Sequence, residues 1–114
     1  MVEESVIRSV RRYLSLVKRN GVEVSFGIVF GSQARGSAKE ESDIDLVVVS
    51  PWYDTHRERK DKDLLWILTV DADTRIEPIP AGEREWYEDT ERVILEIARR
   101  EGERIDPEDT PVQP

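Results

Sequence analysis

The 114-residue sequence predicts a single domain that contains both β-strands and α-helices, an α/β fold. Two short runs rich in β-branched and aromatic residues, 24–30 (VSFGIVF) and 43–49 (DIDLVVV), have the composition of buried strands. Two longer segments, 3–20 and 83–101, repeat apolar residues at the spacing of one helix face. We therefore expect a small sheet on which amphipathic helices pack.

Composition and charge narrow the class of function. The formal net charge of −8 argues against a basic surface for DNA or RNA, because neutralising phosphates needs clustered Lys and Arg. The chain has no cysteine, which removes disulfides and thiol chemistry and favours a reducing cytoplasm. Arg8, Arg11 and Arg12 interrupt the first apolar segment, so no signal peptide or membrane span is expected. A soluble, cytoplasmic protein is the expectation.

The first elements follow in a clear order. The predicted helix at 3–20 ends at Asn20 and Gly21, which tolerate the left-handed backbone conformation. A strand is predicted at about 23–30. A short helix should then begin at Gln33 and end at the next glycine.

A polar loop at 37–42 leads into the second strand, 43–49, which Pro51 ends. The connection at 52–62 interleaves acidic and basic residues, so we expect it to be solvated. Its histidine, His56, has the polar surroundings of an ordinary surface residue rather than a general base.

The C-terminal part predicts a short strand at 75–79, in which Pro78 favours an edge position. One amphipathic helix is predicted over 83–101, because its last turn is basic and a glycine follows it. We assign the domain to residues 1–105. The proline-rich, polar segment 106–114 is predicted to be a disordered tail.

A phosphate-binding loop is predicted where the first strand ends, at Gly31 and Ser32. Gly31 has no Cβ, so an anion can approach its backbone, and Ser32 can cap the next turn and donate a hydroxyl hydrogen bond. The short helix that follows would aim free N–H groups at the same point. Arg35, near the start of that helix, is either a guanidinium clamp for a triphosphate or a solvated side chain.

A metal site is predicted where the second strand begins. Asp43 and Asp45 occupy positions i and i+2, so both carboxylates leave the same face of the sheet. Two like charges about 7 Å apart along a strand repel each other unless a cation lies between them. Hard divalent ions such as Mg²⁺ prefer oxygen ligands and keep substrate phosphates in their shell. The two motifs together predict one site for a nucleoside triphosphate and its metal.

The stretch GSQARGSAKEESDIDLVVV resembles the signature of the DNA polymerase beta-like nucleotidyltransferase superfamily, in particular the minimal nucleotidyltransferases (MNT). The resemblance implies a palm-type fold, a small mixed β-sheet with helices mainly on one face, and a helix at about 57–71. It also implies a third carboxylate on the strand beside Asp-X-Asp. Glu77 is the matching position, although aspartate is usual there, and Asp71 and Asp73 are the alternatives.

The chemistry that this resemblance implies is nucleotidyl transfer, in which an acceptor hydroxyl attacks the α-phosphate of a triphosphate, most simply ATP. Asp43 and Asp45 would hold two Mg²⁺ ions about 4 Å apart, and Glu77 would complete the metal site or take the acceptor's proton. Gly31 and Ser32 would anchor the β- and γ-phosphates. The sequence itself does not identify the base that is used.

The acceptor is expected on another protein, because the chain shows no additional acceptor-binding domain. Proteins that resemble it commonly pair with helical HEPN-type proteins in toxin–antitoxin modules and act as antitoxins by adenylylating the partner. Two alternatives stay open: a non-catalytic module that neutralises a partner by contact, and one subunit of an antibiotic nucleotidyltransferase. The oligomeric state is also open.

Overall fold

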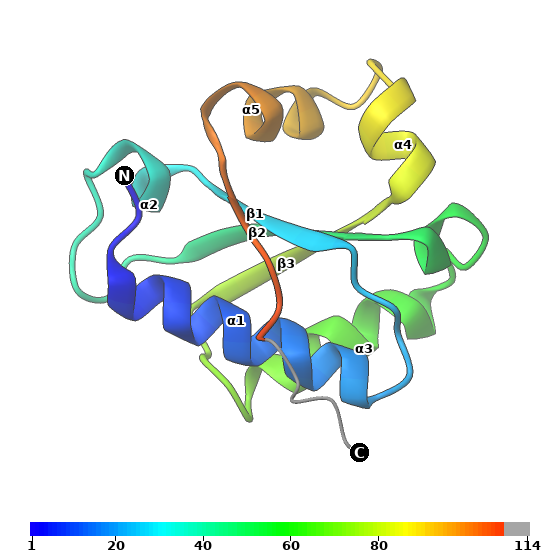
Figure 1. Ribbon diagram of the computed structural model, residues 1–114, viewed down its shortest axis with the longest axis horizontal. Coiled ribbons are helices and arrows are strands. Elements are labelled where there is room, and N and C mark those ends of the chain that lie inside the picture. The colour runs from blue at the N-terminus through cyan, green and yellow to red at the C-terminus, as the bar shows by residue number, and fades with distance from the viewer. Residues whose placement is uncertain (109–114) are drawn as a thin grey trace.

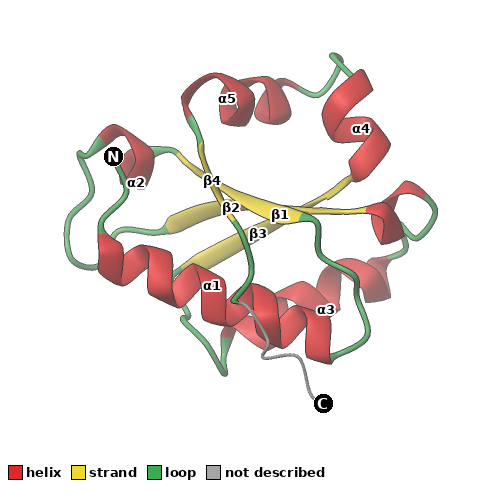
Figure 2. Ribbon diagram, in the orientation of Figure 1, coloured by secondary structure: helices red, strands yellow, loops and turns green. Residues whose placement is uncertain are grey.

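A computed structural model describes residues 1–108 as a four-stranded sheet between two layers of helices (Figure 1, Figure 2). The chain runs through α1 (Glu4–Arg19), β1 (Phe26–Phe30), α2 (Ser32–Arg35), β2 (Ile44–Ser50), the 3₁₀ turn η1 (Pro51–Asp54), α3 (Arg59–Thr69), β3 (Ile76–Gly82), α4 (Glu83–Glu88), α5 (Val93–Glu101) and β4 (Glu103–Ile105). Within the described residues, no helix is long and apolar enough to cross a membrane.

The sheet is mixed, in the order β3-β2-β1-β4. β1 pairs antiparallel with both β2 and β4, whereas β2 and β3 run parallel. β3 lies at an edge, which explains how it accommodates Pro78 and Pro80: their missing N–H groups cost little on a strand with one partner. The predicted mixed sheet and the edge position of the Glu77 strand are confirmed.

The two long helices, α1 and α3, cover one face of the sheet, and the shorter α4 and α5 cover the other (Figure 1). The predicted α/β class with a small mixed sheet is confirmed; the two longest helices share one face, but α4 and α5 cover the other face as well. Strand β2 separates two hydrophobic clusters, because Leu46 and Val48 face α1 and α3 while Val47 and Val49 face α4 and α5. These four residues are fully buried, so β2 forms the centre of the core.

The predicted single helix at 83–101 is wrong, because it is divided into α4 and α5. The side chain of Asp89 accepts a hydrogen bond from the Glu91 N–H at 2.7 Å, a local turn that competes with helix continuation. Arg99 of α5 then donates hydrogen bonds to three carbonyls at the end of α4 and in the turn, those of Glu85, Trp86 and Asp89.

Other boundaries differ from the expected ones by a few residues. β1 begins at Phe26, and β3 continues to Gly82. α3 begins at Arg59, and the Asp61 side chain in its first turn accepts a hydrogen bond from the Glu58 N–H at 2.9 Å. β4 was not predicted at all. Its three residues are too few for a periodic signal, and they form a strand only because the edge of β1 is there to pair with.

The predicted disordered tail at 106–114 lies mostly outside the described residues, which end at Glu108. The Glu108 N–H donates a hydrogen bond to the Ser15 hydroxyl of α1 at 3.0 Å.

We predict that Arg99→Ala lowers the free energy of unfolding by about 2 kcal/mol, because it removes charged hydrogen bonds to three carbonyls. It also removes the guanidinium from its position 5.0 Å from the centre of the Trp86 ring. Urea denaturation measures the change. The control is Arg100→Ala, at the exposed neighbouring position. Equal stability of the two variants would contradict the assigned role of Arg99.

Candidate functional site

Three carboxylates gather where β2 and β3 begin. In the parallel register of these strands Asp45 lies beside Glu77, and Asp43 precedes Asp45 by two positions. Alternation along β2 places Asp45 on the face of Val47 and Val49, which pack towards α4 and α5. Asp43 is exposed, and the other two carboxylates are partly buried. The structure therefore brings together the three predicted acidic residues on one face of the sheet.

The carboxylates influence one another electrostatically. Burial raises the pKa of the Asp45 carboxyl, and the charges of Asp43 and Glu101 raise this pKa further. Burial also raises the pKa of Glu77, to which the charges of Asp43 and Asp45 add. A hydrogen bond between the Asp45 and Glu77 carboxyl groups lowers the pKa of the former and raises that of the latter. Such mutual repulsion in the free protein is typical of groups arranged for a ligand rather than for stability.

Gly31 brings the predicted phosphate loop against these carboxylates. Strand β1 ends at Phe30, which lies opposite Asp45 in the antiparallel register. Gly31 follows with φ 74° and ψ −149°, a conformation that is open essentially only to glycine. A Cβ on Gly31 would overlap the Asp45 carboxylate. The absence of a side chain here therefore lets the loop and the acidic residues share one site.

The start of α2 differs slightly from the prediction. Ser32, not Gln33, is its first residue, and Gly31 occupies the N-cap, so the expected capping role of Ser32 is wrong. Gln33 is a residue that the sequence reasoning missed. Its buried amide nitrogen lies 3.3 Å from the Ser42 carbonyl oxygen and 3.4 Å from that of Asp43. Gln33 thus ties α2 to the residues that open β2.

Glu101, the last residue of α5, is the second residue that the sequence reasoning missed. Its Oε1 accepts hydrogen bonds from the Gly31 N–H at 3.0 Å and from Nη1 of Arg35 at 3.1 Å. Arg35 is therefore more than a solvated side chain. It borders the site, and its charge lowers the pKa of the Asp45 carboxyl. No local pattern signals Glu101, which lies 70 residues from Gly31 in the sequence.

The alternative third carboxylates are not part of this arrangement. Asp71 is exposed in the turn after α3. Asp73 is bound by the Arg75 guanidinium, with Nε 3.0 Å from Oδ1 and Nη2 2.7 Å from Oδ2. These hydrogen bonds lower the pKa of the Asp73 carboxyl. A hydrogen bond with the side chain of Ser9 lowers it further, and Ser9 belongs to α1, on the other face of the sheet. The geometry favours Glu77.

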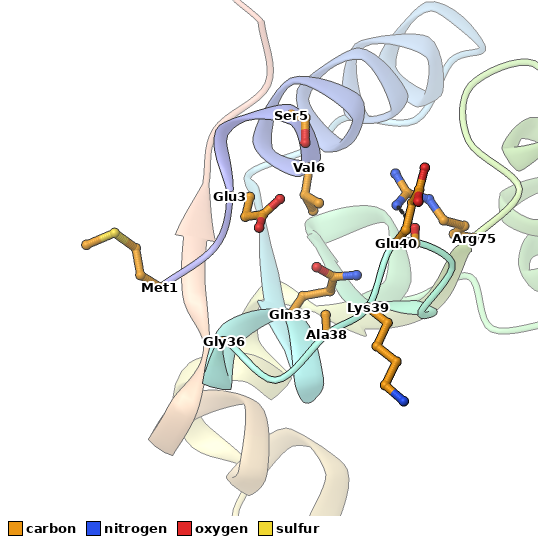
Figure 3. A pocket seen from close by; sticks show the side chains of 10 residues that line it. All are labelled: Met1, Glu3, Ser5, Val6, Gln33, Gly36, Ala38, Lys39, Glu40 and Arg75. Atoms are coloured by element: carbon orange, nitrogen blue, oxygen red, sulfur yellow. Dashed lines mark hydrogen bonds between the residues drawn. The ribbon is translucent and has the colours of Figure 1, made fainter.

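Two other features lie away from the carboxylates. A cavity of about 510 Å³ lies between the N-terminal turn of α1 and the loop after α2, with Gln33 in its wall (Figure 3). Val6 of α1 also lines it, whereas none of the three carboxylates does. His56 stacks on Trp52 with ring centres 3.6 Å apart, beyond the other end of β2. His56 is therefore far along the sheet from the site, as expected for a surface histidine.

The donor set fits a hard divalent ion, although it is not gathered into a finished metal site. Within residues 1–108, no three Asp, Glu, His or Cys side chains are arranged so that they could hold a metal ion as they stand. The chemistry of the donors nevertheless suits Mg²⁺, because carboxylate oxygens are its ligands and a cation would relieve the repulsion at Asp45 and Glu77.

We predict that Gly31→Ala destabilises the protein by about 2–4 kcal/mol, through backbone strain and overlap with Asp45. The control is Gly36→Ala, at φ 77°, where an added Cβ meets no atom within 4 Å. Gly36→Ala should lower the free energy of unfolding by only about 1 kcal/mol, the penalty of a non-glycine residue in the left-handed conformation. Thermal and urea unfolding compare the two variants. Similar losses in both would show that overlap with Asp45 is unimportant.

We predict that Asp45→Asn raises the melting temperature at pH 7 in the presence of a chelator. The pKa of the Asp45 carboxyl is higher in the native state than in the unfolded chain, so the native state binds more protons at pH values between the two. The stability of the wild type therefore falls as the pH rises through this range. The gain in melting temperature should shrink below a pH of about 4, where the Asp45 carboxyl of the unfolded wild type is also protonated. Asp71→Asn, at the exposed turn, is the control. A lower melting temperature for Asp45→Asn at pH 7 would contradict the repulsion.

Comparison with known proteins identifies the family. A model of the nucleotidyltransferase domain family matches residues 10–100, which include Gly31 and the three carboxylates. The fold is similar to that of a protein from Sulfolobus solfataricus assigned as a nucleotidyltransferase and solved at 1.40 Å, with a TM-score of 0.55, 20% identity and 76% of each chain covered. No curated protein matches the chain. The family match extends over most of the sequence, and the chain therefore belongs to the nucleotidyltransferase domain family.

Proposed function

We propose that this chain is an Mg²⁺-dependent adenylyltransferase that moves AMP from ATP to a hydroxyl group of a partner protein. The single observation that carries the proposal is the pairing of Asp45 with Glu77 across parallel strands, with Gly31 packed against Asp45. The arrangement combines carboxylates for a metal with a backbone that an anion can approach. Two-metal phosphoryl chemistry needs these components.

The chain's own groups have distinct tasks in this proposal. Asp43, Asp45 and Glu77 would hold the Mg²⁺ ions, and the Gly31 N–H and the Ser32 hydroxyl would anchor the β- and γ-phosphates. When bound at these residues, Mg²⁺ would neutralise charge on the triphosphate and lower the pKa of the acceptor hydroxyl. Arg35 supplies a positive charge beside the same backbone.

The reaction balances without a covalent intermediate on the protein. The acceptor oxygen attacks the α-phosphorus, the bond from this phosphorus to the bridging oxygen breaks, and pyrophosphate leaves with the electron pair. The acceptor's proton would pass to Glu77 if this carboxylate acts as the general base, or to solvent water if Glu77 holds a metal ion instead. Positioning and electrostatic stabilisation supply the remaining rate enhancement.

Exposed apolar side chains on the face of the sheet that carries the site support a protein as the acceptor. Val93 is 71% exposed and Ile97 is 40% exposed on α5, the helix whose last residue contacts Gly31. Tyr87 of α4 is 67% exposed and lies near Phe26, towards the other end of the strands. Exposed apolar groups on one face of a protein are typical of protein contacts. A helical HEPN-type toxin of the cytoplasm, adenylylated by this chain as its antitoxin, is the partner that we propose.

A non-catalytic partner-binding module is the second candidate. The observation that favours it is the Glu101 carboxylate, which engages the Gly31 N–H and Arg35 in the free protein. In such a module the nucleotidyltransferase fold would neutralise a partner by contact alone.

We predict that the purified protein transfers label from [α-³²P]ATP, with Mg²⁺, to a protein in a lysate of its own source. With [γ-³²P]ATP the added protein should give no more label than the lysate alone, because the γ-phosphate leaves with pyrophosphate. Mass spectrometry of the labelled protein should show an added AMP. Asp43→Asn and Asp45→Asn should each reduce transfer at least about 100-fold, the scale of losing one electrostatic contribution in a transition state.

Further variants assign the third carboxylate. Glu77→Gln should keep ATP binding and lose transfer, while Asp71→Asn should keep both, because Asp71 lies exposed outside the site. Undiminished transfer by the Asp43 and Asp45 variants would contradict the site. Binding of a partner protein with no transfer of AMP would favour the second candidate.

A further inference from the structure

The Glu101 carboxylate occupies the donors that the proposed function assigns to phosphate. A single oxygen, Oε1, accepts from both the Gly31 N–H and the Arg35 guanidinium, at 3.0 Å and 3.1 Å. Carboxylate and phosphate oxygens accept hydrogen bonds from the same groups in similar geometry. In the free protein a side chain of the chain itself thus satisfies these two donors.

The backbone beside Glu101 is held in place. Glu101 ends α5, and β4 begins two residues later at Glu103, paired with β1. Gly102 joins them through a hydrogen bond from its N–H to the Ala98 carbonyl at 2.9 Å. A Cβ on Gly102 would overlap Ile28 and that same carbonyl. The backbone here has little freedom to shift, whereas the Glu101 side chain, 26% exposed, can rotate towards solvent.

The charge of Glu101 also opposes an incoming polyanion. It is close enough to Asp45 to help raise the pKa of that carboxyl. A phosphate on the Gly31 N–H would lie where the Glu101 carboxylate now lies, and two anions cannot share one donor pair without repulsion. Binding of the triphosphate and the present contact of Glu101 are therefore mutually exclusive.

We propose that Glu101 is an affinity-determining residue, an internal competitor that must leave the Gly31 N–H and Arg35 before a polyphosphate binds there. The proposal rests on the proposed function, because it concerns the same site. It goes further in two respects. Glu101 keeps the Gly31 N–H hydrogen-bonded in the free protein, and it lowers the affinity for both the nucleotide and the leaving pyrophosphate. Glu101 lies immediately after the segment that matches the family, residues 10–100.

Isothermal titration with Mg²⁺-ATP and with Mg²⁺-pyrophosphate tests the competition. Glu101→Gln keeps the shape of the side chain and removes its charge, and Glu101→Ala removes both acceptor oxygens. We expect both variants to bind more tightly than the wild type, with a gain of about 10-fold for Glu101→Ala, the equivalent of one charged hydrogen bond. The matched control is Glu96→Gln on the same helix, where the glutamate pairs with Arg99 instead. It should leave both affinities unchanged.

The amide resonance of Gly31 gives an independent reading of the contact. In ¹H–¹⁵N spectra of the nucleotide-free protein, Glu101→Ala should move the Gly31 proton upfield, because its hydrogen bond is lost. Glu96→Gln should leave this resonance in place. An unchanged Gly31 resonance in Glu101→Ala would overturn the proposal.

The outcomes separate this proposal from the proposed function. If the wild type binds and transfers AMP but the Glu101 variants bind no more tightly, the competitor role is wrong and the function stands. Weaker binding, or lost transfer at unchanged affinity, would also overturn the competitor role and make Glu101 a supporting group. If neither wild type nor variants bind Mg²⁺-ATP or Mg²⁺-pyrophosphate, both proposals are wrong.

Discussion

The parallel pairing of β2 with β3 is the constraint on which the site depends. Its register places Asp45 beside Glu77, so the free protein has to tolerate two neighbouring carboxyl groups whose pKa values are both raised, chiefly by burial. β2 can carry this cost because Leu46 and the three valines after it are fully buried between two layers of helices. β2 thus belongs both to the hydrophobic core and to the acidic site. Burial of its later residues stabilises the strand that carries Asp45.

Much of the fold and half of the site could be predicted from local sequence. Gly31, Asp43 and Asp45 are recognisable because strand ends and strand alternation are local patterns. Glu77 required the further knowledge of which strands are neighbours. The division of helix 83–101 and the position of Glu101 were missed, because each is decided by contacts made after the chain has folded. The turn at Asp89 is held by an arginine ten residues away, and Glu101 meets Gly31 across 70 residues.

The break between α4 and α5 has a direct effect on the site. A continuous helix over residues 83–101 would extend about 28 Å in one direction. Instead α5 turns back over the sheet towards α2 (Figure 1), and its last turn reaches the end of β1. Arg99 therefore connects the geometry of the α4–α5 turn with the surroundings of Gly31, although it does not touch the carboxylates.

The pairing of β4 with β1 bears on the order of events during synthesis. β1 leaves the ribosome early, but its outer edge stays without a partner until residues 103–105 have been made. Until then, exposed backbone groups lie next to the glycine loop, an arrangement prone to pairing with other chains. A nascent chain can form α1, β1 and β2 from nearby contacts, yet Gly31 acquires its surroundings only when the last strand closes the sheet.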